Sequence, residues 1–263
     1  MAEHMNLYQK ASHYDIIFDR DVGPEIKFLE NLYQQHGPGR PLESVLDIAC
    51  GPGYHARAFA RQGVRAAGID LGEAMIQLAG EKAVDEGLSV EWLVGDMRQF
   101  TLSQPVDLAF SMFDAIDPLL TNEDVIRHLR AIRTNLTESG VYVIDLTHPR
   151  DCSPWHYGDF QYQGTRNGVD VILTWATNNP TFDWSTGVGE VEVKMQVRQD
   201  GRETVITDRA MERFLDPQHI QLLVALAGQF EIAGWYGNHR IDQPFDNSDR
   251  SQRMIAVVRR NNH

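Results

Sequence analysis

The sequence predicts an α/β protein: a doubly wound, mostly parallel sheet of seven strands with helices on both faces, and an antiparallel β insertion after the fifth strand. Three observations support this fold. Short apolar runs alternate with stretches of helical periodicity between residues 41 and 149, which is typical of consecutive βαβ units. A Gly-x-Gly turn joins the first of these runs to a helix. The spacing of apolar residues then changes to two over residues 150–213, which indicates antiparallel strands.

The elements of the core follow one another in a regular order. Residues 6–35 place apolar side chains three or four positions apart, so one or two amphipathic helices are expected in an N-terminal helical cap that spans residues 1–40. The α/β core comprises residues 41–149 and 214–263. Its strands are expected at 44–49, 65–70, 90–94, 106–111, 141–146, 230–237 and 253–260, and its helices at 53–62, 72–85, 121–135 and from 216. Apolar runs such as 106–111 suit strands that are buried on both faces.

Residues 150–213 form the insertion. Asp200 and Gly201 mark a tight hairpin between two alternating segments. Because the insertion leaves the core at the carboxyl end of a strand, we expect it to lie over the ligand side of the sheet. It can serve there as a substrate lid or as a dimerisation element. Both alternatives stay open, so a homodimer is one of the expected states.

Composition narrows the class of protein. Of the 263 residues, 42% are hydrophobic and 23% are charged, which is ordinary for a soluble globular protein. No apolar run is long enough to cross a membrane, and the first residues lack the pattern of a signal peptide, so a cytoplasmic location is expected. The two cysteines, Cys50 and Cys152, are too few for a disulfide framework.

The net charge of −13 bears on the partners of the protein. A surface this acidic repels a phosphate backbone unless a local basic patch overcomes the repulsion. The basic clusters at 127–133 and 257–260 are small, and we expect them to be a solvated helix face and the end of a strand. The expected partner is therefore a small-molecule substrate, cationic or neutral, and neither nucleic acid nor a membrane.

The stretch VLDIACGPGYH at 45–55 is the first candidate for a nucleotide site. Gly51 and Gly53 follow a strand and precede a helix, where glycines let the backbone turn sharply and approach a ligand. These glycines also satisfy the dinucleotide fingerprint, so they do not distinguish one nucleotide from another. Asp47 does distinguish between them, because a pyrophosphate disfavours a nearby anion, whereas the α-amino group of a ligand favours one. The alternative role of Asp47 is to cap backbone amides of the loop.

Two further carboxylates end the next two strands. Asp70 lies nineteen residues after Gly51, where an acidic side chain accepts hydrogen bonds from ribose hydroxyls. Asp96 and Met97 follow the third strand and are placed to bind the amine and the ring of an adenine. Met75 either lies against the adenine or belongs to the helix core. Because the three carboxylates end successive strands, we expect them around one cleft.

Taken together, these motifs resemble those of the class I S-adenosylmethionine-dependent methyltransferases. The matching stretches are VLDIACGPGYH, GIDLGEAMI, VGDMRQF, VDLAFSMFDAID and HLRAIRTNLTESGVYVIDL. The resemblance covers roughly residues 40–150 and 216–260. It points most to the small-molecule subgroup, which includes amino-sugar N,N-dimethyltransferases and glycine N-methyltransferase-like enzymes. That subgroup shares the GDMR motif, the MF pair after the fourth strand and the antiparallel insertion.

The resemblance implies S-adenosyl-L-methionine as cofactor and a set of residues that contact it. These are expected to be Asp47, Ala49, Gly51, Gly53, Asp70, Leu71, Met75, Gly95, Asp96, Met97, Ser111 and Met112. In the subgroup an N-terminal tyrosine closes over the cofactor, a role that maps onto Tyr14, with Tyr8 as the alternative. His55 either contacts the carboxylate of the cofactor or is a partly buried helix histidine.

The sequence departs from nucleic-acid and protein methyltransferases after the fourth strand. It reads SMFDAIDP there and lacks an Asn/Asp-Pro-Pro-aromatic motif. This disfavours methylation of adenine or cytosine amines and of protein glutamine. The loop Gly51-Pro52-Gly53 is a variant of the usual Gly-Thr-Gly that keeps both glycines.

The implied reaction is an in-line displacement at a sulfonium methyl group, for which a protein supplies alignment and a dry site. An amine acceptor needs only to lose a proton, so nitrogen is favoured over oxygen or carbon. With Tyr14, the candidate catalytic residues are Asp114 and His148, which follow the fourth and fifth strands. Asp114 can instead cap a turn, and His148 can instead terminate its strand.

The insertion begins with an aromatic-rich stretch. Trp155, His156 and Tyr157 either line the substrate pocket or pack the insertion onto the core. No metal site is expected, because the histidines and aspartates around them lack a recognised ligand spacing. Other classes stay open: an O- or C-methyltransferase, an NAD-linked oxidoreductase, an aminopropyltransferase and a non-catalytic nucleotide-binding subunit. Asp47 and the GDMR motif argue against the oxidoreductase.

Overall fold

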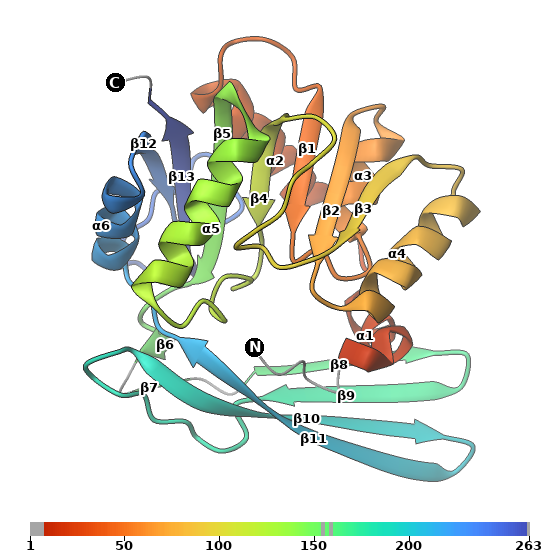
Figure 1. The fold of residues 1–263 in the computed structure, drawn as a ribbon. Helices are drawn as coiled ribbons and strands as arrows, with labels where there is room; N and C mark the ends of the chain where they lie inside the picture. The colour runs from red at the N-terminus through yellow and green to blue at the C-terminus, as the bar shows by residue number, and fades with distance from the viewer. Residues whose placement is uncertain (1–7, 154–155, 158–159, 262–263) are drawn as a thin grey trace.

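The computed structural model describes residues 8–153, 156–157 and 160–261. Its central sheet consists of β1 (Ser44–Ile48), β2 (Arg65–Asp70), β3 (Val90–Val94), β4 (Val106–Ser111), β5 (Leu136–Thr147), β12 (Phe230–Tyr236) and β13 (Arg253–Arg260). The strand order is β12-β13-β5-β4-β1-β2-β3 (Figure 1). β13 runs antiparallel to both of its neighbours, whereas the other neighbouring pairs are parallel. The predicted α/β fold is confirmed.

Helices cover both faces of this sheet. α2 (Gly23–His36) and α3 (Tyr54–Arg61) pack on the face that carries Val45, and α5 (Asn122–Asn135) and α6 (Pro217–Ala227) pack on the face that carries Leu46. α4 (Glu73–Asp85) contacts β2 and β3. Every residue of β1 and β4 is buried, as expected for parallel strands between two layers of helices.

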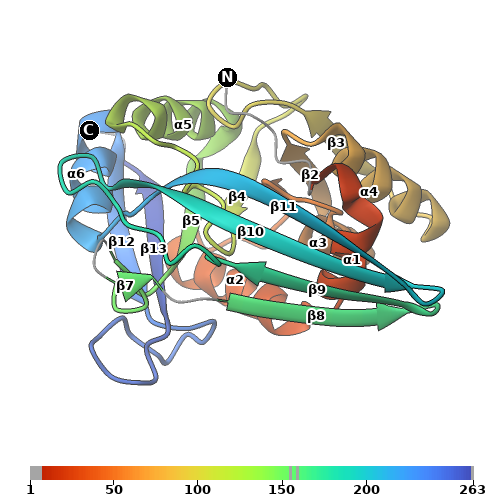
Figure 2. The ribbon, with the colours of Figure 1, turned by 90° about the horizontal axis from the view of Figure 1, so that it is seen from below.

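The insertion forms a second, antiparallel sheet in the order β11-β10-β9-β8. Its strands are β8 (Phe160–Arg166), β9 (Val169–Trp175), β10 (Val188–Gln199) and β11 (Arg202–Arg213), preceded by a small hairpin of β6 (Cys152–Ser153) and β7 (His156–Tyr157). Asp200 and Gly201 have φ values of 51° and 72°, as the Asp-Gly turn between β10 and β11 requires. Figures 1 and 2 show this sheet lying across the carboxyl ends of the parallel strands.

The N-terminal elements lie between the core and the insertion. η1 (Tyr8–Lys10) and α1 (Ala11–Phe18) contact α4, and α1 also contacts β8. The approach of α1 to β8 is close at Gly164, because a Cβ there would lie 2.2 Å from the carbonyl oxygen of Ile16. A residue without a side chain is therefore needed at this position. The domain boundaries at residues 40, 149 and 213 stay a prediction.

β5 is longer than the sequence predicts. It begins at Leu136, directly after α5, rather than at residue 141. Its first residue pairs with Val106, and the register then shifts before the regular pairing from Val141 onward. The carboxyl end of the strand, which positions the site, lies close to its predicted place.

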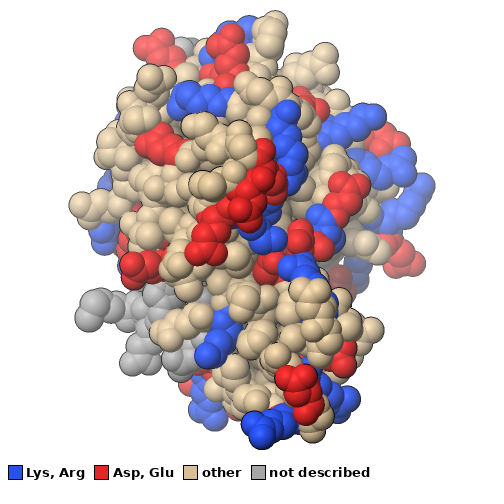
Figure 3. Space-filling model, turned by 90° about the vertical axis from the view of Figure 1, so that its right-hand side faces the viewer, with Lys and Arg blue, Asp and Glu red and all other residues tan. Residues whose placement is uncertain are grey.

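Surface features bear on the partners. On the face shown in Figure 3, lysine and arginine side chains are interspersed with aspartate and glutamate, so that face does not present a field of one sign. Within residues 8–153, 156–157 and 160–261, no helix is long and apolar enough to span a membrane.

Candidate active site

The loop after β1 turns through residues in the left-handed region. Ala49, Gly51 and Gly53 have φ values of 53°, 51° and 75°, and α3 starts directly after them. The two glycines serve different purposes. A Cβ on Gly53 would lie 2.3 Å from the ring of Trp92, whereas a Cβ on Gly51 would meet no atom within 4 Å. Gly53 is therefore required for packing, and Gly51 presents bare backbone to open space where a ligand can approach.

Asp70, at the end of β2, fastens this loop. Its carboxylate accepts hydrogen bonds from the backbone amides of Gly51 at 2.8 Å and Gly72 at 2.7 Å. Asp70 thus lies at the end of β2, beside the open backbone of Gly51. The assignment of Asp70 to a ribose stays a prediction.

Asp47 lies beneath the loop and is buried. The backbone amide of Ala56 donates to its Oδ2 at 3.3 Å. Burial raises the pKa of Asp47 well above its ordinary value; the amide opposes this change, and the charge of Asp70 adds to it. The contact with Ala56 is the capping arrangement named above as the alternative. Contact between Asp47 and an amine of the cofactor stays a prediction.

The loop after β3 brings Asp96 to the same end of the sheet. The amide of Gly95 donates to the carbonyl oxygen of Asp70 at 2.9 Å, which ties this loop to β2. The guanidinium of Arg98 donates to both carboxylate oxygens of Asp96 and lowers the pKa of that carboxyl. Asp96 thus forms an ion pair with Arg98. Its contact with an adenine amine stays a prediction.

A buried chain of hydrogen bonds holds the backbone of the same loop. Nδ1 of His128 donates to the carbonyl oxygen of Met97 at 2.9 Å, and the hydroxyl of Tyr142 donates to Nε2 of His128 at 2.7 Å. Ser111 contacts the same hydroxyl at 2.9 Å. Burial lowers the pKa of His128 to about 4, so the ring is neutral at neutral pH. Contrary to the solvated face predicted for residues 127–133, His128 is fully buried.

The remaining predicted cofactor residues differ in exposure. Met75 is buried and lies beside Gly72, which favours the helix-core alternative over contact with an adenine. Ser111 and Met112, where β4 ends, are also buried, whereas Leu71 is 46% exposed. Among these side chains, Leu71 is the one that can lie directly against a ligand.

Tyr14 lies on α1 and is half-buried. Its ring packs against Phe18 with the ring centroids 4.3 Å apart. Burial raises the pKa of the Tyr14 hydroxyl, and the charge of Asp70 raises it further, so the hydroxyl and this carboxylate are neighbours. Tyr14 is therefore close to the place that the predicted cover over the cofactor would occupy. Closure over a cofactor stays a prediction.

Asp15, the next residue, clamps α1 in this position. Its carboxylate accepts a hydrogen bond from the hydroxyl of Tyr54 at 2.9 Å and pairs with Lys82 at 2.9 Å and Arg166 at 2.5 Å. Burial opposes ionisation, but these three contacts outweigh it and lower the pKa of Asp15. The helix is thereby joined to α3, α4 and β8 at once.

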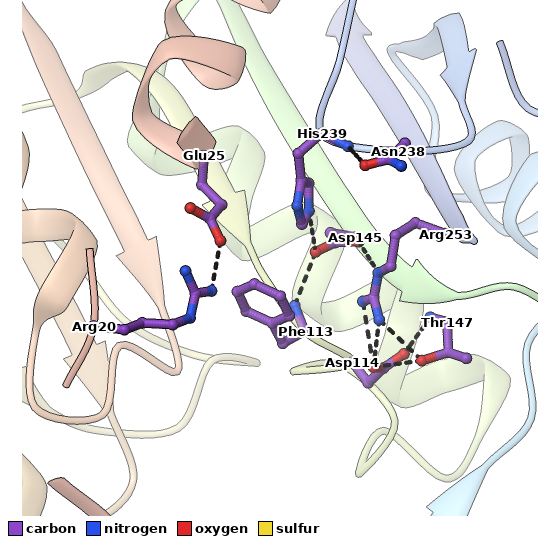
Figure 4. A network of polar contacts seen from close by, with 9 residues as sticks. All are labelled: Arg20, Glu25, Phe113, Asp114, Asp145, Thr147, Asn238, His239 and Arg253. Atoms are coloured by element: carbon purple, nitrogen blue, oxygen red, sulfur yellow. Dashed lines mark hydrogen bonds and ion pairs between the residues drawn. The ribbon is translucent and has the colours of Figure 1, made fainter. Parts of the chain in front are cut away.

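A network of charges lies where β4 and β5 end and β13 begins (Figure 4). Asp145 is fully buried and accepts hydrogen bonds from Nε of Arg253 at 2.7 Å, Nε2 of His239 at 3.1 Å and the amide of Phe113 at 3.1 Å. Burial raises the pKa of Asp145, but Arg253 and His239 outweigh burial and hold it at about 2. Asp114 lies 3.3 Å from the same guanidinium. The sequence patterns singled out neither Asp145 nor Arg253.

The two predicted residues on the acceptor side are placed differently. Asp114 has a φ of 64°, accepts a hydrogen bond from the hydroxyl of Thr147 at 2.8 Å and borders a cavity. His148 is buried, and both of its ring nitrogens are engaged. Nε2 donates to the carbonyl oxygen of Asp246 at 3.0 Å, and Nδ1 accepts from the amide of Arg150 at 3.1 Å. These contacts favour the strand-end role of His148, because neither nitrogen is left to move a proton.

A second ion pair reaches the cleft from the segment before α2 (Figure 4). Arg20 donates to one carboxylate oxygen of Glu25 at 2.5 Å, and its guanidinium lies 5.4 Å from the centre of the exposed Phe113 ring. The other oxygen of Glu25 and Nε2 of His55 are buried and have no hydrogen-bond partner among the described residues. Burial lowers the pKa of His55 to about 4. Because buried polar atoms without partners are rare, these two atoms indicate a ligand with matching groups.

A small cavity lies between the insertion and the end of β5. The residues that carry its charges are Asp114, Asp117, Glu212 and Arg213. Of the aromatic residues predicted at the start of the insertion, Tyr157 lines this cavity, and Trp155 and the side chain of His156 lie outside the described residues. A search of the described part of the chain finds no group of three His, Cys, Asp or Glu side chains that could hold a metal ion.

Sequence comparisons identify the domain. Residues 45–140 match the model of the methyltransferase domain family. The chain is 29% identical over 173 residues to the dTDP-4-amino-2,3,4,6-tetradeoxy-D-glucose N,N-dimethyltransferase of Saccharopolyspora spinosa, which covers 64% of each protein. It is 29% identical over 138 residues to the dTDP-3-amino-3,4,6-trideoxy-alpha-D-glucopyranose N,N-dimethyltransferase of Streptomyces venezuelae, which covers 51% of this chain and 56% of that enzyme. The chain thus matches about half to two thirds of the length of these relatives.

Solved structures share the fold over nearly the whole chain. An S-adenosylmethionine-dependent methyltransferase from Clostridium acetobutylicum has a TM-score of 0.77 at 18% identity, over 97% of this chain and 100% of that one. DesVI from Streptomyces venezuelae has a TM-score of 0.73 at 21% identity, over 95% and 98%. The fold is that of these solved structures, and residues 45–140 match the methyltransferase domain family. The domain match at residues 45–140 and the similarity to two N,N-dimethyltransferases confirm the resemblance seen in the sequence motifs.

Proposed function

We propose that the protein transfers the methyl group of S-adenosyl-L-methionine to the nitrogen of a small-molecule amine. One observation carries this proposal: the open backbone of Gly51, beside Asp70, shares one end of the sheet with the carboxylate-lined cavity at Asp114. The first suits a nucleoside, and the second suits a cationic amine. The names of the two sequence relatives, both N,N-dimethyltransferases, support nitrogen as the acceptor atom.

The side chains of the cleft fit the groups of this cofactor. Asp70 suits the ribose hydroxyls, and the bare backbone at Gly51 lets the nucleoside approach. Arg20 suits the carboxylate of the methionyl part, and the unpartnered oxygen of Glu25 suits its ammonium group. The unpartnered Nε2 of His55 lies buried in the helix that follows the loop. When bound, S-adenosyl-L-methionine supplies a methyl group on a positively charged sulfur.

The contribution of the chain is alignment and the exclusion of water. In this proposal Tyr14 covers the cofactor, and the insertion sheet acts as a lid over the acceptor (Figure 2). The lid is preferred to a dimerisation element because one side of the sheet buries Val193 and Met195, whereas exposed side chains such as Arg209 and Glu190 form ion pairs. A charged face of this kind suits solvent better than a subunit interface.

An amine accepts a methyl group only as the neutral base, so an ammonium must lose a proton in the site. Glu212 is placed to take this proton, because burial raises the pKa of Glu212 to about 7. Asp117 lines the same cavity, and Asp114 is held by Arg253 as an orienting group. His148 has no part in this proposal. A cytoplasmic location, the absence of nucleic acid and membrane partners and a homodimer stay predictions.

A binding measurement separates the leading classes of function. Isothermal titration calorimetry is expected to show binding of S-adenosylhomocysteine, which Asp70→Ala weakens by about 10- to 100-fold, the equivalent of about 1.5–3 kcal/mol for hydrogen bonds to a charged group. Asp85→Ala, at the exposed end of α4, is the matched control and should bind as the unchanged protein does. Binding of NAD⁺ without binding of S-adenosylhomocysteine overturns the proposal. Mass spectrometry of products then tests the acceptor atom, because transfer to oxygen or carbon alone overturns the choice of nitrogen.

A further inference from the structure

The loop after β3 needs an anchor that the sheet alone does not give. β3 stands at one end of the strand order and pairs with β2. Gly95, the first residue after the strand, is tied to β2 by a hydrogen bond to the carbonyl oxygen of Asp70. On the other side of β3 the described sheet ends, so Asp96 and Met97 must be held from another element. That element is α5, which contributes His128.

The hydrogens along the buried chain at His128 have one consistent order. The carbonyl oxygen of Met97 only accepts, so Nδ1 of His128, 2.9 Å away, must carry a hydrogen. Because burial lowers the pKa of His128 to about 4, the ring is neutral and Nε2 accepts from the hydroxyl of Tyr142. That hydroxyl in turn accepts from the hydroxyl of Ser111. Each group has a partner, so the ring of His128 is fixed both in place and in tautomer.

His128 fixes the orientation of one peptide group. The peptide bond between Met97 and Arg98 is trans, so its C=O and its N–H point in opposite directions. The C=O accepts from His128, and the N–H donates to Oδ1 of Asp96 at 2.8 Å. The side chain of Met97 packs against the core that includes the apolar face of α5. A turn of this peptide group would therefore break the contacts with His128 and Asp96 together.

The carboxylate of Asp96 is held by two routes, and both begin on α5. The first is the peptide group that His128 orients. The second is the guanidinium of Arg98, which pairs with Asp96 and with Asp124 of α5 at 2.6 Å each. This second route is partly exposed to solvent, whereas His128 is fully buried, and a hydrogen bond is stronger where water is excluded. The side chain of Asp96 is 38% exposed, so a ligand can reach it.

We propose that His128 is a positioning residue for the recognition of adenine. It holds the peptide group that follows Met97 and thereby orients the carboxylate of Asp96 to accept from the exocyclic amine of the base. His128 does not touch the base, because its ring is fully buried and both of its nitrogens are engaged. The inference rests on the proposed function and on the predicted contact between Asp96 and the amine.

This arrangement favours one base over another. The amine of adenine donates to a carboxylate, whereas hypoxanthine has a carbonyl oxygen at that position, which only accepts. Two acceptors that face each other lose a hydrogen bond and repel, so hypoxanthine should bind less tightly. If His128 only supported the packing of α5, its replacement would weaken binding of both bases alike. The ratio of the two affinities therefore separates positioning from packing.

Two ligands test the proposal on the unchanged protein. S-adenosylhomocysteine is compared with S-inosylhomocysteine, in which a carbonyl oxygen replaces the amine of adenine. Both ligands share the ribose and the homocysteine part, so the ratio of their dissociation constants isolates the base. Calorimetry is expected to show that S-adenosylhomocysteine binds at least about tenfold more tightly, the equivalent of about 1.4 kcal/mol.

Substitutions of His128 assign this preference. His128→Leu is expected to lower the ratio to below about threefold, mainly because S-adenosylhomocysteine binds less tightly. In His128→Asn an amide nitrogen takes the place of Nδ1 and can still donate to Met97, so most of the ratio should be kept. His148→Leu is the matched control, because His148 is also buried with both ring nitrogens engaged, directly after β5. Its replacement should leave the ratio unchanged.

A double-mutant cycle tests whether His128 acts through Asp96. Asp96→Ala removes the carboxylate and is expected to abolish the preference for adenine. Addition of His128→Leu to this variant should then leave the ratio as it is, because the group that His128 positions is gone. His128→Leu combined with Tyr142→Phe removes both polar partners from the core, which limits the loss of stability. This combination should also lose the preference, and it replaces His128→Leu if that single variant does not fold.

The outcomes separate this inference from the proposed function. If His128→Leu keeps the full ratio, or weakens binding of both ligands equally, the positioning role is overturned and the function stands. The same holds if the unchanged protein binds the two ligands equally well, or if Asp96→Ala keeps the preference for adenine. If neither ligand binds to the unchanged protein, the proposed function fails, and the inference fails with it.

Discussion

Replacement of Asp145 by asparagine removes one charge from the centre of the network that lies where β5 ends and β13 begins. Arg253 and His239 hold the pKa of this buried carboxyl at about 2, against an ordinary value of 3.8. That difference corresponds to about 2.5 kcal/mol of stability. Because the folded-state pKa lies below the unfolded one, the contribution is complete above about pH 5 and is lost as the pH falls toward about 2. About 1 kcal/mol of it is lost by about pH 3.

Urea unfolding at several pH values measures this effect. At neutral pH, Asp145→Asn is expected to lower the free energy of unfolding by about 2–4 kcal/mol, because Arg253 stays buried with only part of its compensating charge. The difference from the unchanged protein should narrow by about 1 kcal/mol between about pH 5 and about pH 3. Asp85→Asn, at the exposed end of α4, is the control and should show no such change. A difference that is the same at both pH values would refute the reasoning.

Three further substitutions test separate parts of the site. Gly51→Ala is expected to cost only about 1 kcal/mol of stability but to weaken binding of S-adenosylhomocysteine at least about tenfold. In Gly53→Ala the added methyl group would lie 2.3 Å from an aromatic ring. This variant should instead lower stability by about 1–3 kcal/mol. Calorimetry and thermal unfolding measure the two effects, and equal behaviour of both variants would contradict the distinction. Tyr142→Phe leaves two buried groups without their partner and should cost about 1–3 kcal/mol in urea unfolding; an unchanged midpoint would show that the buried chain is not formed. Gly164→Ala should displace α1 and speed proteolysis of the N-terminal segment while the core melts as before, and equal proteolysis would argue against the close packing.

Local patterns are enough to predict the sheet and the glycine loop. The runs that become β1 and β4 are apolar throughout because helices cover both of their faces. Gly51 and Gly53 are recognisable because a positive φ and close approach both exclude side chains. Asp70 is recognisable by its place at the end of the next strand. Each of these signals lies within a few residues of the feature that it predicts.

The charged network has no such local signal. Asp145 and Arg253 are 108 residues apart, and their contact depends on the antiparallel register that pairs Arg253 with Thr147. A period-two pattern predicts a strand at Glu212 and Arg213 but not that both side chains border one cavity. His128 did carry a signal, because it lies three residues after a buried valine and four before a buried isoleucine, on the apolar face of α5. Its basic neighbours concealed that signal.

The contact between Asp15 and Arg166 has a consequence for how the protein assembles. The two residues are 151 positions apart, whereas the strands that carry the glycine loop and Asp70 pair with their neighbours within residues 44–111. On a growing chain the cradle for the nucleoside can therefore form while β8 is still unmade, and α1 docks afterward. Because Asp15 joins α1 to α3, α4 and β8, this helix leaves the folded sheet only when all three contacts break together.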